Sequence, residues 1–193
     1  YTNYELMKVL ETRIELSRER NRNRLLDSIL SESMEITNCD AGTLFLYKDE
    51  KLYFKLMKTI SMNIDKGKDG ESIELPPVEM NADNICAYTV LHRTVLNIEN
   101  VYDNTEFDFE GPRRYDKITG YHTQSMLTIP LLNQDEVVGV LQLINSMDEQ
   151  GNAIAFEKRV EPIILSLASL AAIAISNIYY MEEIKTQMWS FTE

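Results

Sequence analysis

Cysteine and glycine are scarce in this chain, which limits the chemistry it can carry. Its 193 residues include two cysteines, Cys39 and Cys86, and seven glycines. Neither cysteine has a metal-type partner nearby, and a chain of this length does not need a disulfide to fold. The glycines form no phosphate-binding loop, and no nucleophile stands beside a base. We therefore expect no catalytic residue and no metal site, and interpret both cysteines as small buried apolar residues.

Positive charge is also in short supply. The chain has 19 lysines and arginines against 31 aspartates and glutamates, for a net charge of -12. Such a surface repels a phosphate backbone, so nucleic acid is not an expected partner. The one dense basic run, residues 18–24, has the spacing of a solvated helical face.

A secretory signal is lacking as well, because no basic, apolar and small-residue series opens the chain. We expect a cytoplasmic location, and the opening at Tyr1 indicates a fragment of a longer protein. Residues 162–181 carry no charge and have the length of a membrane span. Three serines and Asn177 dilute their hydrophobicity, and glutamates flank them where positive anchors are expected. We therefore predict no membrane span.

The same uncharged stretch predicts a long helix that begins at Pro162, whose fixed φ suits a first turn. Its apolar residues follow a 3,4 spacing that continues through Lys185 to Met188, namely Ile164, Leu167, Ala171, Ala174, Ile178 and Met181. Two interpretations stay open: the helix is pressed against a sheet, or it pairs with a second chain towards Met188. We expect it to be buried on most sides.

The N-terminal part also has helical spacing. Neither glycine nor proline occurs before Gly42, and the periodic residues are Leu6, Leu10, Ile14, Leu25, Ile29 and Ser33. We therefore divide the chain into an N-terminal signalling helix or helices at residues 1–36 and a domain at residues 37–193, whose C-terminal helix begins near residue 162.

The middle of the chain is rich in strands. Two β-hairpins are predicted, one turning at residues 48–51 and one at residues 133–136. Between them, Ile85, Tyr88 and Leu91 have helix spacing, TVLNIENV reads as a strand, and residues 104–123 mix turn and helix signals. This alternation predicts an α+β fold, an antiparallel sheet flanked by helices.

The stretch DKITGYHTQSMLTIPLL, residues 116–132, crowds polar side chains at one end of an apolar strand. They are Thr119, Tyr121, His122, Thr123, Gln124 and Ser125. A sheet needs an apolar face but not this cluster, which suits a polar small molecule better than a core. The nearby aromatic residues could stack on a planar ring or belong to the core, namely Phe107, Phe109, Tyr115 and Tyr121.

Several motifs in this order resemble a GAF domain: GTLFLY, NICAYTVLHRTVLNIENVY, YDKITGYHTQSMLTIPLL, EVVGVLQLIN and a long terminal helix. The match spans about residues 38–180. The pieces TGYHTQSMLTIPL and VVGVLQLIN resemble the GAF domains of cyclic-nucleotide phosphodiesterases and of bacterial sensors attached to HD-type phosphohydrolases or nucleotide cyclases. The resemblance implies a six-stranded antiparallel sheet with the terminal helices on one face and a ligand pocket on the other.

The resemblance also implies a regulatory sensor that forms a homodimer through its terminal helices and controls an attached output domain. Its ligand would be a small molecule such as cAMP or cGMP. By analogy, the ligand-binding residues would be Thr43, Ile85, Ala87, Tyr102, Asp103, Phe107, Tyr115, Asp116, Thr119, Thr123 and Gln142.

Some positions depart from the cyclic-nucleotide-binding pattern, which often has an Asn-Lys pair and, after a later Phe, an Asp-Glu pair. Here Asn145 is followed by Ser146, and Val160 stands before Glu161, so the Lys–Asp salt bridge cannot form. Alternatives are therefore a different metabolite, a structural dimerisation module without a ligand, or a GAF-type sulfoxide reductase that would depend on Cys86 or Cys39.

Overall fold

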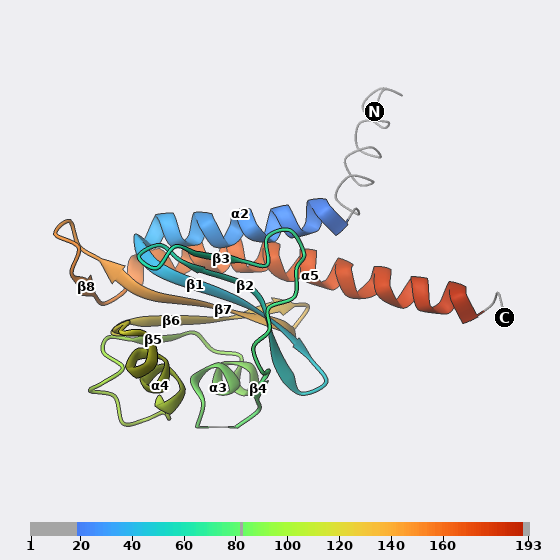
Figure 1. Ribbon diagram of the computed structural model, residues 1–193. Helices are drawn as coiled ribbons and strands as arrows, with labels where there is room; N and C mark the ends of the chain where they lie inside the picture. Colours follow the sequence, from blue (N-terminus) through green and yellow to red (C-terminus); the bar gives the residue numbers. More distant parts are fainter. Residues whose placement is uncertain (1–18, 82, 191–193) are drawn as a thin grey trace.

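One antiparallel sheet forms the centre of the fold (Figure 1). The computed structural model describes residues 19–81 and 83–190, so the predicted helical residues Leu6, Leu10 and Ile14 lie outside the described part. The strand order is β3-β2-β1-β7-β6-β5. These strands are β1 (Cys39–Lys48), β2 (Lys51–Thr59), β3 (Ile64–Lys66), β5 (Leu96–Ile98), β6 (Met126–Asn133) and β7 (Glu136–Met147). The expected six-stranded path is confirmed.

Two further strands extend this sheet. β4 (Val78–Glu79) pairs with β2, and β8 (Ala153–Ile154) pairs with β7. Each is two residues long, which is too short to show the alternation that predicts a strand.

Both predicted hairpins are confirmed. β1 and β2 are joined by Asp49 and Glu50, and β6 and β7 by Gln134 and Asp135. All four residues have positive φ, between 51° and 67°. A two-residue loop with positive φ at both positions matches the right-handed twist of the flanking strands, so these turns set the register of each pair.

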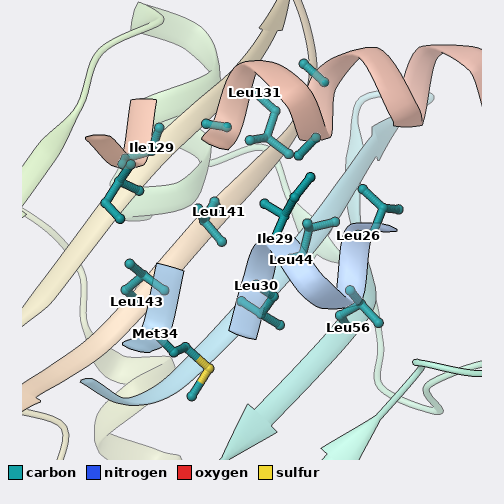
Figure 2. Packing of buried hydrophobic residues seen from close by; sticks show 14 of the residues in the cluster. Leu26, Ile29, Leu30, Met34, Leu44, Leu56, Ile129, Leu131, Leu141 and Leu143 are labelled. Atoms are coloured by element: carbon teal, nitrogen blue, oxygen red, sulfur yellow. The ribbon is translucent and has the colours of Figure 1, made fainter. Parts of the chain in front are cut away.

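Helices α2 (Glu19–Thr37) and α5 (Glu161–Ser190) lie side by side on one face of the sheet (Figure 1). Alternate strand residues point towards them, as strand geometry requires. Figure 2 shows Leu26 and Leu30 of α2 directed at the side chains of the sheet. The fully buried leucines of this layer are Leu26, Leu30, Leu44, Leu56, Leu127, Leu131, Leu141 and Leu143.

Helix α5 begins where the sequence predicts, with Pro162 in its first turn after a short 3-10 turn, η1 (Lys158–Val160). The stretch Lys158–Ser190 is long and apolar enough to cross a membrane by length and composition. In the fold, however, one side of α5 packs on the sheet through Ile164, Ala168 and Ile175.

The expectation that α5 is buried on most sides is wrong. Only the side that faces the sheet and α2 is covered, and apolar residues on the other side are exposed, including Ile163, Leu170 and Ile173. The predicted seam through Ile164 and Ala171 lies on the covered side. It packs within the same chain.

The opposite face of the sheet carries the two shorter helices, α3 (Ile85–His92) and α4 (Glu110–Thr119) (Figure 1). α3 begins at Asn84, whose side-chain oxygen accepts hydrogen bonds from the backbone N–H groups of Cys86 and Ala87. α4 ends at Gly120, which has a φ of 78° and donates its N–H to the carbonyl of Asp116. These two helices stand over the sheet and leave room for the site.

Candidate ligand pocket

A cavity of about 370 Å³ lies between the sheet and the layer formed by α3, α4 and the segment before β4. Its size is within the range of small-molecule sites. The lining combines apolar side chains with a few polar ones, the usual composition of such sites. Side chains of β1, β2, β6 and β7 form its floor, and residues of α3 and α4 form its cover.

A larger hollow, about 810 Å³, lies elsewhere, between the β1–β2 turn and the C-terminal half of α5. Charged side chains make up much of its lining, among them Asp49, Arg93, Glu182 and Glu183. We place the candidate site in the smaller cavity because aromatic rings and hydrogen-bonding groups converge there under a cover of two helices.

A row of polar residues crosses three strands on this face of the sheet, and two of its members, Thr43 and Gln142, line the pocket. Thr128, Gln142 and Thr43 are partners in register on β6, β7 and β1, and all three are buried. The Gln142 amide donates to Cys86 Sγ at 3.3 Å, to Met126 Sδ at 3.2 Å and to Thr128 Oγ1 at 3.4 Å. Sulfur is a weak acceptor, so this amide is poorly satisfied for a buried group.

Apolar side chains surround this row. Phe45 and Phe54 pack with ring centroids 4.8 Å apart and an interplanar angle of 53°. Met57 on β2 is the cross-strand partner of Thr43. Met126 on β6 and Ile144 on β7 are partners in the neighbouring row. The floor therefore offers broad apolar contact with hydrogen-bonding groups at its middle.

Tyr121 connects the pocket lining to a buried carboxylate. Its hydroxyl donates to Asp40 Oδ2 at 2.8 Å and accepts from Asn145 Nδ2 at 3.2 Å. Asp40 also accepts from the backbone N–H and the hydroxyl of Ser61, at 2.9 and 2.6 Å. Burial first, and then the hydrogen bond to Asp40, raises the pKa of Tyr121 well above its ordinary value. The phenol therefore stays a neutral donor.

Asp116 is a second buried carboxylate, and it fixes the segment that follows α4. It accepts hydrogen bonds from the Tyr102 hydroxyl at 2.6 Å, the Thr123 N–H at 2.8 Å and the Thr123 hydroxyl at 2.9 Å. The ring of Tyr102 in turn stacks on His122, with centroids 4.7 Å apart. These contacts give Asp116 a structural role beneath the pocket wall.

The pocket has little positive charge in its described lining. Its one lysine, Lys58, forms ion pairs with Asp27 at 2.7 Å and Asp65 at 3.3 Å. At the start of α3, Asn84 already occupies two of the N–H groups that a phosphate would use. A bound anion would therefore depend on hydroxyl groups and on the backbone near Gly111 in α4.

Five of the predicted ligand-binding residues line the cavity: Thr43, Ile85, Tyr115, Thr123 and Gln142. The other six lie outside its lining: Ala87, Tyr102, Asp103, Phe107, Asp116 and Thr119. Asp103 accepts from Asn100, Phe107 packs edge-on against Tyr88, and the Thr119 hydroxyl donates to the carbonyl of Tyr115. Contact of any of the eleven with a ligand stays a prediction.

Sequence reasoning missed much of the apolar lining, namely Ala41, Phe45, Phe54, Met57, Met126 and Ile144. A signal for part of it was present. Ala41, Thr43 and Phe45 alternate along β1, so they must share one face of the sheet. To know that this face lines a cavity, one must also know that β1 pairs with β2 and β7, and this pairing cannot be read from a single sequence.

Both cysteines are buried, as predicted. Burial raises the pKa of Cys39 to about 11 and that of Cys86 to about 12. A thiol with such a pKa is almost entirely protonated at neutral pH and is a poor nucleophile. Among the described residues, no group of three or more His, Cys, Asp or Glu side chains is placed to hold a metal ion.

Comparison with solved structures shows the same fold in bacterial proteins. The GAF domain of a phosphoenolpyruvate-protein phosphotransferase from Acinetobacter is 14% identical, with a TM-score of 0.63, covering 95% of this chain and 99% of that one. A GAF domain/HD domain protein from Geobacter sulfurreducens is 12% identical, with a TM-score of 0.59, covering 86% of this chain and 98% of that one.

Sequence comparison points the same way. The dual 3',5'-cyclic-AMP and -GMP phosphodiesterase 11A of Takifugu rubripes is 34% identical over 94 residues, which are 48% of this chain. The match spans 10% of that protein's length. The family model of the GAF domain matches residues 21–175, well over half of the chain. The chain therefore belongs to the GAF domain family.

Proposed function

We propose that this chain senses a small molecule through the 370 Å³ pocket and regulates an output domain attached to it. GAF domains are regulatory sensor domains of signalling proteins. The observation that carries the proposal is the buried polar pair of Thr43 and Gln142 in the pocket floor, with Thr128 behind it as a partner of Gln142. Buried polar groups cost stability unless they are well hydrogen-bonded, and a ligand with donors and acceptors would supply what the sulfur contacts do not.

The ligands that we propose to test first are cAMP and cGMP. The name of the phosphodiesterase relative supports this class, and so does the lining, where Phe45, Phe54 and Tyr115 offer surfaces for a planar ring. Since Lys58 is already paired with two carboxylates, the cyclic phosphate would be held by hydroxyl and N–H groups. We therefore expect the uncharged base of the cyclic nucleotide to contribute more to the affinity than its cyclic phosphate does.

A chain of hydrogen bonds provides a route from the pocket to the terminal helices. Asn145 donates to the hydroxyl of Tyr121 and accepts from the N–H groups of Gln124 and Ser125. The next residue, Ser146, donates its hydroxyl to the carbonyl of Thr37 at 2.8 Å, at the end of α2. A ligand that displaces Tyr121 would therefore strain contacts that end on α2 and on the strand beneath α5.

We further propose that the module works as a homodimer in the cytoplasm, with its terminal helices passing the signal to the output domain. An HD-type phosphohydrolase or a nucleotide cyclase is the output domain we favour, since the Geobacter sulfurreducens neighbour is a GAF domain/HD domain protein. The two helices packed on one face of the sheet are the element whose arrangement we propose that the ligand biases.

Thermal unfolding against a panel of cAMP, cGMP, other nucleotides and common metabolites tests the sensor. A ligand held at 100 times its Kd adds about 2.7 kcal/mol to the free energy of unfolding, which moves the Tm by several degrees. Thr43→Val with Gln142→Leu should abolish the shift and keep the fold. Thr186→Val, on the exposed part of α5, is the matched control and should keep the ligand-dependent Tm shift.

The two competing classes predict different results. A structural dimerisation module would show no Tm shift with any compound. Its Thr43→Val, Gln142→Leu variant would still fold and dimerise as the native chain does. A sulfoxide reductase would depend on Cys39 or Cys86. We propose no such activity, because both thiols are buried with a raised pKa, so the native chain and the double Cys→Ser variant should be equally inactive towards methionine sulfoxide.

A further inference from the structure

Strand β5 forms one edge of the sheet, and its outer side has no partner strand. It pairs only with β6, through Leu96, Asn97 and Ile98. In an antiparallel pair the N–H and C=O groups of alternate residues point to opposite sides of the strand, so part of the β5 backbone is directed away from the sheet. Within the described chain, no outward backbone group of residues 95–99 forms a hydrogen bond. Such an edge is a template for one more strand.

A groove of about 520 Å³ lies along this edge. It is lined by residues 95–100 and by four residues of the loop that follows β5, namely Asp103, Asn104, Glu106 and Phe107. The loop uses its polar groups internally. Asn100 Oδ1 accepts from the Tyr102 N–H at 3.0 Å, and Asn104 Oδ1 accepts from the Glu106 N–H at 2.9 Å. The loop therefore borders the edge of β5 without pairing with it.

The charged residues in the lining of this groove are all acidic. They are Glu99, Asp103 and Glu106, and all three are exposed. None of them takes part in an ion pair with a described residue. Asp103 Oδ2 accepts one hydrogen bond, from the Asn100 amide at 3.0 Å. Three unpaired carboxylates beside free backbone groups create a negative potential that attracts a basic partner.

The opposite edge of the sheet, formed by β3, differs in its charges (Figure 1). There Asp65 forms ion pairs with Lys58 and with Lys68, each at 3.3 Å, so charges of both signs are balanced within the chain. At the β5 edge they are not balanced. A second copy of this edge would bring carboxylates opposite carboxylates, and like charges directly opposite destabilise a strand pair. The occupant that the β5 edge favours is therefore a basic strand of another protein.

Asn97, at the centre of β5, has an acceptor without a partner. Its Nδ2 donates to the Phe156 carbonyl at 3.1 Å and to Glu161 Oε1 at 3.3 Å, which holds the amide against the segment before α5. Its Oδ1 is buried and accepts no hydrogen bond from any described residue. Buried polar atoms without a partner are rare in folded proteins. Asn97 also lines the groove, where an added strand supplies donors beside it.

The side chains of an added strand would alternate between two environments. Leu96, Ile98 and Phe107 belong to the apolar cluster on the α3 and α4 side of the sheet, whereas Val95 packs with the cluster under α2 and α5. On the first side, a residue of the added strand would meet the Phe107 ring and the carboxylates of the loop. That combination suits the apolar stem and charged head of lysine or arginine. The alternate residues would meet Val95, which suits an apolar side chain.

We propose that β5 accepts an extended basic segment of a partner protein as an additional strand, with lysine or arginine at alternate positions near Glu99, Asp103 and Glu106. Residues 95–99 span roughly 16 Å at about 3.3 Å per residue, so a short segment is sufficient. Backbone hydrogen bonds supply the affinity, and the carboxylates select a basic segment. This surface is separate from the ligand pocket, since no residue lines both.

Titration of the 193-residue chain with a capped peptide of alternating lysine and valine tests the edge. We expect binding, with slower amide hydrogen exchange at residues 95–99 measured by NMR. A peptide of alternating lysine and proline is the matched control. It has the same charge, but proline lacks the N–H group and does not continue a strand, so this peptide should bind about tenfold more weakly. Equal affinity of the two peptides would overturn strand addition.

Neutral substitution of the three carboxylates tests the charge selection. Glu99→Gln, Asp103→Asn and Glu106→Gln together should raise the Kd of the lysine–valine peptide by about tenfold, because three exposed ion pairs are lost. The same peptide with glutamate in place of lysine should not bind the native chain. Binding of the glutamate peptide with the affinity of the lysine peptide would contradict the selection of a basic partner.

A second triple variant separates the groove from the negative charge of the whole chain. Glu32→Gln, Glu50→Gln and Asp135→Asn remove the same charge at exposed positions outside the groove and should leave the Kd within about twofold. If both triple variants weaken binding equally, the peptide recognises only overall charge and the proposal is wrong. Absence of binding by the lysine–valine peptide, or slower exchange confined to residues outside 95–99, would overturn it as well.

Discussion

The two faces of the sheet use the same strands for different purposes. Under α2 and α5, the side chains are almost all leucine, isoleucine, valine and alanine, and they close into one apolar layer (Figure 2). On the face under α3 and α4, a row of Thr128, Gln142 and Thr43 interrupts the apolar side chains, and a cavity lined by Thr43 and Gln142 remains. Neighbouring residues of one strand, such as Leu141 and Gln142, therefore point into the apolar layer and into the cavity, respectively.

The difference indicates where the fold tolerates change. A closed apolar layer loses packing with every deleted methylene, whereas a face with a cavity already lacks those contacts. We therefore expect substitutions on the helix-covered face to change the free energy of unfolding, and substitutions on the pocket face to change ligand affinity first.

Two neighbours on β7 should differ most in their effect on stability. Leu141→Ala should lower the free energy of unfolding by about 2 to 5 kcal/mol, because a fully buried leucine leaves a cavity between the sheet and the helices. Gln142→Leu should change it by less than about 1 kcal/mol, because it replaces a poorly satisfied amide by an apolar group of similar size. Urea denaturation of both variants measures the difference. Equal losses would show that the pocket face is packed as tightly as the other.

The next largest difference in the free energy of unfolding is expected between alanine substitutions at two glycines. A Cβ at Gly42 on β1 would lie 2.8 Å from Leu30 Cδ1 and 3.0 Å from Met34 Sδ, so Gly42→Ala overpacks the contact between α2 and the sheet. We expect a loss of about 1 to 3 kcal/mol.

Gly111 in α4 is the matched control for Gly42. A Cβ there would meet nothing within 4 Å, and alanine is the better helix former, so Gly111→Ala should gain about 0.5 to 1 kcal/mol. Thermal unfolding of both variants compares the two. A gain at position 42 would show that α2 can move away from the sheet at no cost.

Two tyrosines of the pocket lining, Tyr121 and Tyr115, should also differ in their effect on stability. Tyr121→Phe removes a hydrogen bond to the buried Asp40 carboxylate and should cost about 1 to 2 kcal/mol. Tyr115→Phe, in the same lining, removes only a 3.7 Å contact from the hydroxyl to Met62 Sδ and should be near neutral. If the two variants lose the same stability in urea denaturation, the Asp40 contact does not fix the pocket wall.

The smallest effect on stability at neutral pH is expected from the ionisation of the two thiols, which lie on opposite sides of the sheet. Burial raises the pKa of Cys39 to about 11 and of Cys86 to about 12, from an ordinary value of 9.0. Between pH 9 and these values the unfolded chain releases thiol protons that the folded chain keeps, so the thiol contribution to stability is complete below pH 9 and is lost as pH rises.

The double variant Cys39→Ala, Cys86→Ala isolates this contribution from that of the tyrosines. Its free energy of unfolding should fall less steeply than that of the native chain between about pH 9 and 11, and the two curves should run parallel below about pH 8. Curves that run parallel over the whole range would contradict the burial of the thiols in a low-dielectric environment.

Local pattern was sufficient to predict most of the fold. Alternation and turn position predict both hairpins, helical spacing predicts α3, and Pro162 marks the start of α5. The exposure of half of α5 was not predictable, because the periodicity of Ile164, Ala171 and Ala174 does not state which of two apolar sides meets the sheet. The two-residue strands β4 and β8 were missed because they follow from pairing alone.

The candidate site was predictable only in part. Thr43 and Gln142 line the cavity because strand alternation places them on its face, and Thr123 lines it from the segment between α4 and β6. Asp116 illustrates the limit: the family resemblance predicts its contact with a ligand, which stays a prediction, and in the structure its carboxylate accepts hydrogen bonds from Tyr102 and Thr123 outside the cavity lining. Whether a buried carboxylate faces a cavity or a neighbouring segment depends on contacts between residues distant in sequence.

The length of α5 has a mechanical consequence. A helix of 30 residues is about 45 Å long at 1.5 Å per residue, and the part beyond residue 176 accounts for about 20 Å of it. If binding tilted the packed half by about 5°, the free end would swing by roughly 2 Å, as a lever whose fulcrum is the edge of the sheet. A tilt too small to disturb the core would in this way move the free end of α5 by a distance comparable to an allosteric helix shift.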